Sequence, residues 1–244
     1  MLIFALESTA AVGSVALCRD GEAIASFTLK NGNTHSETLL PMAKAVFDVT
    51  GYTPDDVDLF ACSEGPGSFT GVRIGAATIK GLTFGKDKTV IGVSTLETMA
   101  QNLLPANGLI CPVMNARRGQ VYNALFYGEG EKLTRLCPDR ALAAEELEAE
   151  LISRAEPFYL VGDGVEVARA AFKTLTPLPV SVLAAEQNAI GVAACAYRLY
   201  CEGVRKTDKE LTPTYLRLPQ AERERLSREN AKKSQTSPER SEQK

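Results

Sequence analysis

One glycine-rich segment, residues 65–75 (GPGSFTGVRIG), contains the residue types best suited to binding a ligand. Two glycines around a proline favour a tight turn, and the backbone amides at the start of a following helix can hold an anion. The hydroxyl groups of Ser68 and Thr70 can cap that helix or contact the anion. The alternative is a capped turn between a strand and a helix with no ligand, and the spacing alone leaves both readings open.

The chain has a single histidine, His35, and this narrows the possible chemistry. A zinc site built on two histidines cannot form within one chain, and a Ser-His-Asp triad would have to use His35. The sequence contains neither a G-x-S-x-G motif nor a G-x-x-x-x-G-K-[ST] motif. We therefore expect no metal site, with His35 a polar residue near the start of a helix and Glu37 a solvated acid beside it.

Glycine recurs in the helix that we predict after this loop, at residues 71, 75 and 81. An interior glycine costs about 1 kcal/mol relative to alanine, so a close contact should compensate for it. A neighbouring backbone could supply that contact, either within the chain or across an interface. We favour an interface formed by this helix and the preceding one, with internal packing as the alternative. The expected interface residues are Leu39, Leu40, Ala43, Phe69, Val72, Arg73, Gly75, Ala76 and Ile79.

The spacing of apolar residues predicts an α/β fold in which one order of elements occurs about twice. The first series has strands at 2–6, 14–18 and 23–29, a helix near 36–50, a strand at 57–62, a helix at 71–84, a strand at 89–93 and a helix that begins with the capping box Ser94–Glu97. The second has strands at 109–114, 120–127 and 132–136, a helix near 142–153, a strand at 158–161, a helix near 165–173, a strand near 178–182 and a helix near 188–202. This order is typical of a duplicated ribonuclease-H-like fold with two lobes, residues 1–105 and 106–220, in which the last helix can pack back on the first lobe.

Composition and charge exclude several classes of protein. Hydrophobic residues make up 45% of the 244 positions and no apolar run reaches 18 residues, which indicates a globular protein outside the membrane. The charged tail, residues 221–244, has seven basic and five acidic residues and therefore a net charge of +2. Because the whole chain has a net charge of −3, the body (residues 1–220) has a net charge of −5 and should repel nucleic acid. We expect the tail to be disordered. The six cysteines contain no C-x-x-C pair, and the first residues (MLIFALES) are typical of a β-strand. Both features favour a location in the cytoplasm.

Five segments carry a resemblance to a known family: LESTAAVGSVAL (6–17), HSETLLP (35–41), GPGSFTGVRIG (65–75), NARRGQVYNA (115–124) and PTYLR (213–217). They resemble the bacterial TsaB family, formerly called YeaZ, over nearly the whole chain to about Arg217. That family belongs to the ASKHA superfamily of acetate and sugar kinases, heat-shock ATPases and actin, and its nearest relative is the TsaD carbamoyltransferase. The resemblance implies the same duplicated, two-lobed fold.

The function that this resemblance implies is that of a non-catalytic partner of TsaD, in forming threonylcarbamoyladenosine in tRNAs that read ANN codons. TsaD would transfer the threonylcarbamoyl group with a metal held by two histidines, while a TsaE-like ATPase would reset the complex. The protein alone would form a homodimer through the surface that it offers TsaD, and would meet tRNA only through the complex. It would need no cofactor of its own, although an adenine nucleotide could bind at the complex interface.

Two departures from the family pattern bear on nucleotide binding. The first strand ends in Glu7-Ser8-Thr9 where the family has Asp-Thr-Ser, and Asn115 stands where the family has Asp. The main alternative function is a nucleotide-binding or nucleotide-hydrolysing enzyme of the same superfamily, which would need acidic magnesium ligands in both lobes. A peptidase ranks last because no pair of nucleophile and base is recognisable. The candidate anion- or nucleotide-binding residues are Glu7, Ser8, Thr9, Gly65, Gly67, Ser68 and Thr70.

Overall fold

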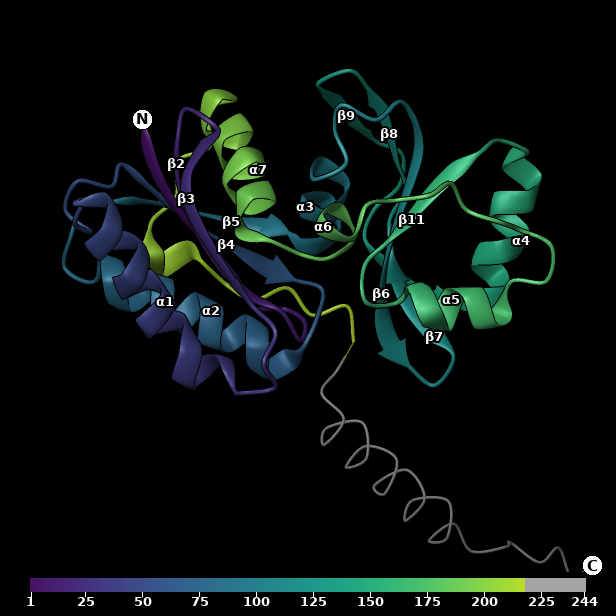
Figure 1. The fold of residues 1–244 in the computed structure, drawn as a ribbon, viewed down its shortest axis with the longest axis horizontal. Coiled ribbons are helices and arrows are strands. Elements are labelled where there is room, and N and C mark those ends of the chain that lie inside the picture. Colours follow the sequence, from purple (N-terminus) through teal and green to yellow (C-terminus); the bar gives the residue numbers. More distant parts are fainter. Residues whose placement is uncertain (218–244) are drawn as a thin grey trace, which may run out of the picture.

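The computed structural model describes residues 1–217, so the expected tail at 221–244 lies outside the described residues. Two β-sheets lie side by side, each flanked by helices (Figure 1). In the first sheet, of order β3-β2-β1-β4-β5, β1 is antiparallel to β2 and parallel to β4. Its strands are β1 (Leu2–Glu7), β2 (Gly13–Arg19), β3 (Glu22–Leu29), β4 (Leu59–Gly65) and β5 (Thr89–Ser94).

Helices cover both faces of this first sheet. On one face lie α1 (His35–Thr50) and α2 (Phe69–Thr83), and on the other lies α7 (Ala189–Cys201). The apolar residues of α1 recur at helical spacing and pack with Phe4 and Phe60 of the sheet. The buried face of α7 consists mostly of small residues (Ala, Gly and Cys), and these allow the helix to lie close to the strands.

The second sheet is built around β6 (Gly108–Arg117), the longest strand. β6 is antiparallel to β7 and β8 and parallel to β11, and the order is β10-β7-β6-β8-β9 with β11 beside β6. The helices α4 and α5 pack in one apolar cluster with β6, while α3 packs in another. These elements are β7 (Gln120–Asn123), β8 (Phe126–Glu129), β9 (Lys132–Arg135), β10 (Arg140–Ala143), β11 (Phe158–Val161), α3 (Thr95–Gln101), α4 (Ala144–Arg154), α5 (Val165–Ala171), α6 (Val182–Ala185) and the 3-10 helix η1 (Asp208–Glu210).

The connectivity confirms the predicted fold class, a duplicated ribonuclease-H-like α/β fold of the actin and ASKHA type. Each sheet has a central strand with antiparallel neighbours on one side and a parallel neighbour on the other. α7 follows the second sheet in the sequence but packs on the first sheet, whereas α3 precedes β6 and packs against it. The expected lobe boundary at 105/106 falls in the loop between α3 and β6.

The strand that we expected at 120–127 is divided into β7 and β8, so that prediction is wrong in detail. The pairing with β6 is interrupted opposite Pro112, which has no backbone N–H to donate to a ladder. The side chain of Asn123 donates instead to the carbonyl oxygens of Pro112 and Ala124, at 3.0 and 2.9 Å. The interruption therefore replaces the missing backbone bonds with a buried side-chain amide.

Two further predictions differ from the structure. In place of a strand at 178–182 there is a single bridge between Tyr159 and Leu178, because the prolines on both sides of Leu178 cannot donate to a ladder. The short strand β10 pairs with β7 and was not predicted, since four residues after Pro138 give little periodicity. Among residues 1–217, no helix has both the length and the apolar character needed to cross a membrane.

Candidate functional site

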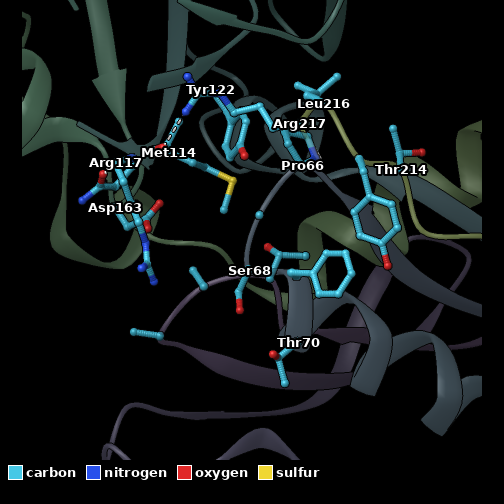
Figure 2. Close-up of a pocket in the computed structure, with 18 residues that line it drawn as sticks. Pro66, Ser68, Thr70, Met114, Arg117, Tyr122, Asp163, Thr214, Leu216 and Arg217 are labelled. Atoms are coloured by element: carbon cyan, nitrogen blue, oxygen red, sulfur yellow. Dashed lines mark hydrogen bonds between the residues drawn. The ribbon is translucent and has the colours of Figure 1, made fainter. Parts of the chain in front are cut away.

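A cleft of about 540 Å³ lies between the two halves of the molecule (Figure 2). It collects the ends of β1 and β4 from the first sheet and of β6 and β11 from the second. Ligands of open α/β sheets bind at such strand ends, so the cleft is the candidate binding site. Its lining comes from residues 9–11, 66–70, 114–117 and 214–217, together with Tyr122 and Asp163.

Glu7, the expected counterpart of a metal- or nucleotide-associated acid, does not line the cleft. Its carboxylate is fully buried and accepts hydrogen bonds from the Thr9 amide at 2.6 Å, the Thr9 hydroxyl at 2.5 Å and the Ser63 hydroxyl. Burial raises the pKa of Glu7 above its ordinary value, although these hydrogen bonds partly offset the effect. The Glu7 carboxyl group is therefore bound to Ser63 of β4 and to Thr9 and does not face a ligand in the cleft.

The glycine-rich segment packs tightly against the end of β1. A Cβ atom at Gly71 would overlap the Ser8 carbonyl oxygen, and one at Gly75 would overlap the Ser8 hydroxyl and lie 3.0 Å from Leu6 Cδ1. The Ser8 hydroxyl donates to the Gly71 carbonyl oxygen at 2.9 Å. Internal packing, which was our alternative explanation, therefore accounts for the glycines at 71 and 75.

Four of the seven expected anion-binding residues line the cleft. Thr9, Gly67, Ser68 and Thr70 do so, and Ser68 also caps α2 by accepting a hydrogen bond from the Gly71 amide at 3.3 Å. The other three residues, Glu7, Ser8 and Gly65, do not line it, and anion binding by the seven residues stays a prediction. Glu7 and Ser8 are buried, while a Cβ at Gly65 would overlap the Thr214 carbonyl oxygen.

Asp163, which the sequence did not single out, brings a carboxyl group to the cleft. It follows β11, and its carboxylate accepts hydrogen bonds from the Gln187 side chain at 3.2 Å and from the Asn115 backbone amide. The residue is exposed to the cleft, yet surrounding protein atoms partly shield its carboxyl group from water, which raises its pKa. An acid between two glycines directly after a strand (Gly162-Asp163-Gly164) was the available signal.

Arg117 is the cationic side chain that the second half contributes at the end of β6. Arg117, Arg118 and Gly119 all have positive φ, at 64°, 57° and 70°, in the tight turn between β6 and β7. Asn115 stabilises this turn, because its side-chain oxygen accepts from the Arg117 amide at 2.8 Å. Asn115 therefore has a structural contact where a metal ligand would need a carboxylate.

His35 does not line the cleft and has a structural contact instead. It is the first residue of α1, and its Nε2 atom lies 2.7 Å from the Ala10 carbonyl oxygen, to which it can donate. Its ring packs beside Gly13, where a Cβ would lie 3.1 Å from His35 Nδ1. Glu37 is exposed and accepts a hydrogen bond from the Thr34 amide at 3.2 Å. Both residues thus have the roles that we expected from the sequence.

Most of the expected interface residues lie inside the molecule. Only Leu40 and Arg73 are exposed, and Phe69 is half-buried. The inner sides of α1 and α2 pack on the first sheet, so residues at those helical positions cannot offer a surface, and our prediction is wrong for them. The buried members are Leu39, Ala43, Val72, Gly75, Ala76 and Ile79.

Several apolar residues are exposed on or directly after these two helices. Leu40, Val49 and Phe84 have exposed fractions of 54%, 79% and 80%. Ala77 and Gly81 are exposed on α2, and a Cβ at Gly81 would meet no atom within 4 Å. Leu40 and Val49 are nine residues apart in α1, so they lie on opposite flanks of that helix, whereas Ala77 and Gly81 lie about one turn apart on the outer side of α2. The exposed surface of these two neighbouring helices (Figure 1) is called here the α1/α2 face.

Comparison with known proteins identifies the family of this chain. The family model for TsaD, tRNA N6-adenosine threonylcarbamoyltransferase, matches residues 29–224, which is more than half of the sequence. A relative from Bacillus subtilis, named tRNA threonylcarbamoyladenosine biosynthesis protein TsaB, is 29% identical over 91% of this chain and 96% of its own. The TsaB protein of Escherichia coli is 38% identical over 53% of this chain and 60% of its own. The chain belongs to the TsaB (YeaZ) family, which shares the TsaD family model.

Solved structures agree with this placement. A Pseudomonas aeruginosa protein described as similar to the peptidase YeaZ has a TM-score of 0.76 at 25% identity, covering 88% of this chain and 99% of its own. A second structure, titled YeaZ from Pseudomonas aeruginosa, has a TM-score of 0.75 at 24% identity and the same coverage. At 24% identity, the similarity to the second structure shows only that the folds are alike.

The two most specific TsaB-like motifs of the sequence meet at the cleft. In the first motif, Arg73 lies over the ring of Phe69, with its guanidinium carbon 3.7 Å from the ring centroid. In the late PTYLR motif, Tyr215 stacks on Phe69 at 4.7 Å and its hydroxyl accepts from Arg73 Nε at 2.8 Å. Sequence reasoning identified both motifs but could not show that they are in contact.

Proposed function

We propose that this protein takes part in forming threonylcarbamoyladenosine in tRNA as the non-catalytic partner of a TsaD-like carbamoyltransferase. Its family and the names of its relatives support the pathway. The observation that carries the non-catalytic role is the inward orientation of Glu7, which removes from the cleft the carboxylate that could bind a metal. His35, the single histidine, contacts the Ala10 carbonyl oxygen and does not supply a metal ligand in place of that carboxylate.

The partner would bind the α1/α2 face, according to this proposal. Ala77 and Gly81 lie about one turn apart on the exposed side of α2 and carry little or no side chain, so a helix of another molecule can approach closely there. A second copy of the chain would use the same face, which makes the homodimer and the complex with TsaD mutually exclusive. Transfer chemistry, contact with tRNA and contact with a TsaE-like ATPase would then belong to the assembled complex in the cytoplasm.

Nucleotide binding is the second candidate, and the cleft favours it. Hydroxyl groups of Ser68 and Thr70, the start of α2 and Arg117 could contact phosphate oxygens there (Figure 2). Asp163 is the acidic residue among those lining the cleft, so one carboxylate is available where two-lobed magnesium binding needs more. We therefore place an adenine nucleotide in the complex as a bound component and not as a substrate that this chain hydrolyses.

Reconstitution tests the function directly. The full-length chain, the TsaD and TsaE proteins of its own organism, the enzyme that supplies threonylcarbamoyl-AMP, and tRNA are combined, and each protein is omitted in turn. We expect modified tRNA to require both this chain and TsaD, with none formed when TsaD is omitted. Modification by this chain without TsaD, or undiminished modification without this chain, would contradict the proposal.

A matched pair of variants tests the surface. Ala77→Arg places a long charged side chain in the middle of the α1/α2 face, whereas Ala170→Arg makes the same change on the exposed side of α5. We expect Ala77→Arg to weaken TsaD binding at least tenfold, or about 1.4 kcal/mol, in calorimetry while Ala170→Arg binds normally. Equal binding by both variants would exclude this face as the docking surface.

A further inference from the structure

The last described segment, residues 211–217, runs from one half of the molecule to the other, and its residues 214–217 line the cleft. Leu211 is buried in the core of the first half. The Thr214 amide donates to the Glu64 carbonyl oxygen, at 2.6 Å, next to the end of β4. Arg217 Nη1 then donates to the Ala116 carbonyl oxygen of β6, at 2.8 Å. The segment, yellow in Figure 1, is therefore attached to both sheets.

Tyr215 gives the segment its strongest side-chain attachment. Its ring stacks on Phe69 in the first turn of α2, and its hydroxyl accepts from Arg73 one turn later. Arg73 is itself stacked on Phe69, so the three side chains hold one another in place. Gly65, with φ at 119°, lets the segment pass, because any side chain there would overlap the Thr214 carbonyl oxygen.

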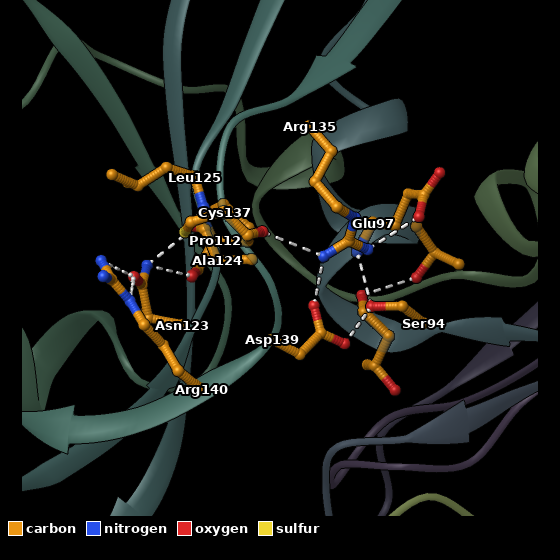
Figure 3. Close-up of polar contacts among 12 residues, drawn as sticks. Ser94, Glu97, Pro112, Asn123, Ala124, Leu125, Arg135, Cys137, Asp139 and Arg140 are labelled. Carbon is orange, nitrogen blue, oxygen red and sulfur yellow. Dashed lines mark hydrogen bonds and ion pairs between the residues drawn. The ribbon is translucent and has the colours of Figure 1, made fainter. Parts of the chain in front are cut away.

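A second attachment joins the halves at another part of their boundary (Figure 3). Glu97 of α3 pairs with Arg135 of β9, at 2.7 Å, and with Arg198 of α7. Arg135 also pairs with Asp139 at 2.5 Å, and Asp139 accepts from the Ser94 hydroxyl at the end of β5, at 2.6 Å. α7 packs on the first sheet and β5 is one of its strands, whereas β9 is a strand of the second sheet. The network therefore spans the boundary between the two halves. In Figure 1, β9 lies at the upper edge of the boundary with α3 below it, and the 211–217 segment lies at the lower edge.

We propose that residues 211–217 are an interlobe clasp, which acts together with the Glu97 network to hold the cleft at one fixed opening. Two halves joined at a single edge can rotate about that edge, as in hinge closure. Attachments at both edges remove this rotation. The protein would then act as a rigid support whose α1/α2 face keeps a constant relation to the cleft, and this inference holds whichever partner binds.

Hydrogen exchange of the full-length protein tests the clasp. The double variant Tyr215→Ala/Arg217→Ala removes the stacking, the bond to Arg73 and the bond to Ala116. Amides at the two sides of the cleft, Ser68, which donates to Thr9 O at 2.7 Å, and Arg117, should then exchange at least about tenfold faster. Amides in the central strands β1 and β6 should exchange at unchanged rates. Tyr215→Phe keeps the ring and loses only the hydroxyl, so it should give a smaller increase at the same positions.

Arg205→Ala is the matched control, because Arg205 also stacks on a tyrosine, Tyr200, at 3.4 Å, but makes its contacts within one half. It should leave exchange on both sides of the cleft unchanged. Faster exchange confined to residues 211–217 would overturn the proposal, since the segment would then be a surface strand without influence on the cleft. An equal increase throughout β1 and β6 would also overturn it, because the segment would then support the whole core and not the opening.

Discussion

Close contacts of single residues explain features that helix propensity alone leaves puzzling. Gly75 occupies an interior helical position at a cost of about 1 kcal/mol relative to alanine. The cost is offset because β1 ends against α2, where the Ser8 hydroxyl fills the space that a side chain would need. Gly81 lies two turns further along, on the outer side of the helix, and no such contact exists there.

This contrast gives a prediction for a pair of identical substitutions. Gly75→Ala should destabilise the protein by about 1–3 kcal/mol, because the new methyl group overlaps Ser8 and presses on Leu6. Gly81→Ala should stabilise it by up to about 1 kcal/mol through helix propensity. Denaturant unfolding of both variants measures the difference. If Gly75→Ala were as stable as Gly81→Ala, the close packing of α2 on β1 would be refuted.

Glu7 leads to a second prediction at this scale, concerning pH. Its raised pKa means that folding favours the protonated acid, so the stability that the neutral form supplies is lost as pH rises through the raised pKa. Glu7→Gln stays neutral, and its stability relative to the wild type should therefore increase from pH 4 to pH 8. Urea midpoints of the two proteins across that range measure the trend. Glu145→Gln, at an exposed position of α4, is the control, and a trend that is flat or reversed for Glu7→Gln would contradict the prediction.

At the scale of elements, the first turn of α3 both caps the helix and supplies an acid that pairs with distant arginines. Ser94 caps α3 as predicted, since its hydroxyl accepts from the Glu97 amide at 3.3 Å. Glu97 does not complete the expected capping box, because its carboxylate turns to Arg135 and Arg198 instead. The pattern Ser-x-x-Glu identified the helix start, but two arginines far along the chain decided what the acid does.

The Glu97 network should therefore contribute measurable stability. Glu97→Ala leaves two arginines without their shared partner, and we expect a loss of about 1–2 kcal/mol in denaturant unfolding. Lys44→Ala removes an exposed pair with Asp48 within α1 and should cost less than about 0.5 kcal/mol. The loss for Glu97→Ala should shrink in high salt. Equal effects of the two substitutions would show that the network is only a set of surface pairs.

For the whole molecule, charge sets the expected behaviour toward tRNA. Residues 1–220 carry a formal charge of −5, so a chain ending at Pro219 should bind tRNA weakly by itself. Filter binding at several salt concentrations measures this, with the TsaD complex as the positive comparison. Tight binding by the isolated chain with a steep salt dependence would contradict the prediction, and would mean that a local basic surface outweighs the acidic body.

The sequence by itself determined most of the order of strands and helices and hence the duplicated fold, because apolar periodicity is a local property that each segment carries in its own residues. It also identified the glycine-rich segment and the late PTYLR motif. Only the tertiary structure decided that Glu7 turns away from the cleft, that Gly75 faces Ser8 and not a partner, and that Tyr215 rests on Phe69 and Arg73. Contacts of this kind depend on where distant strands end relative to one another, and packing within the fold fixes those positions, whereas spacing along the chain does not.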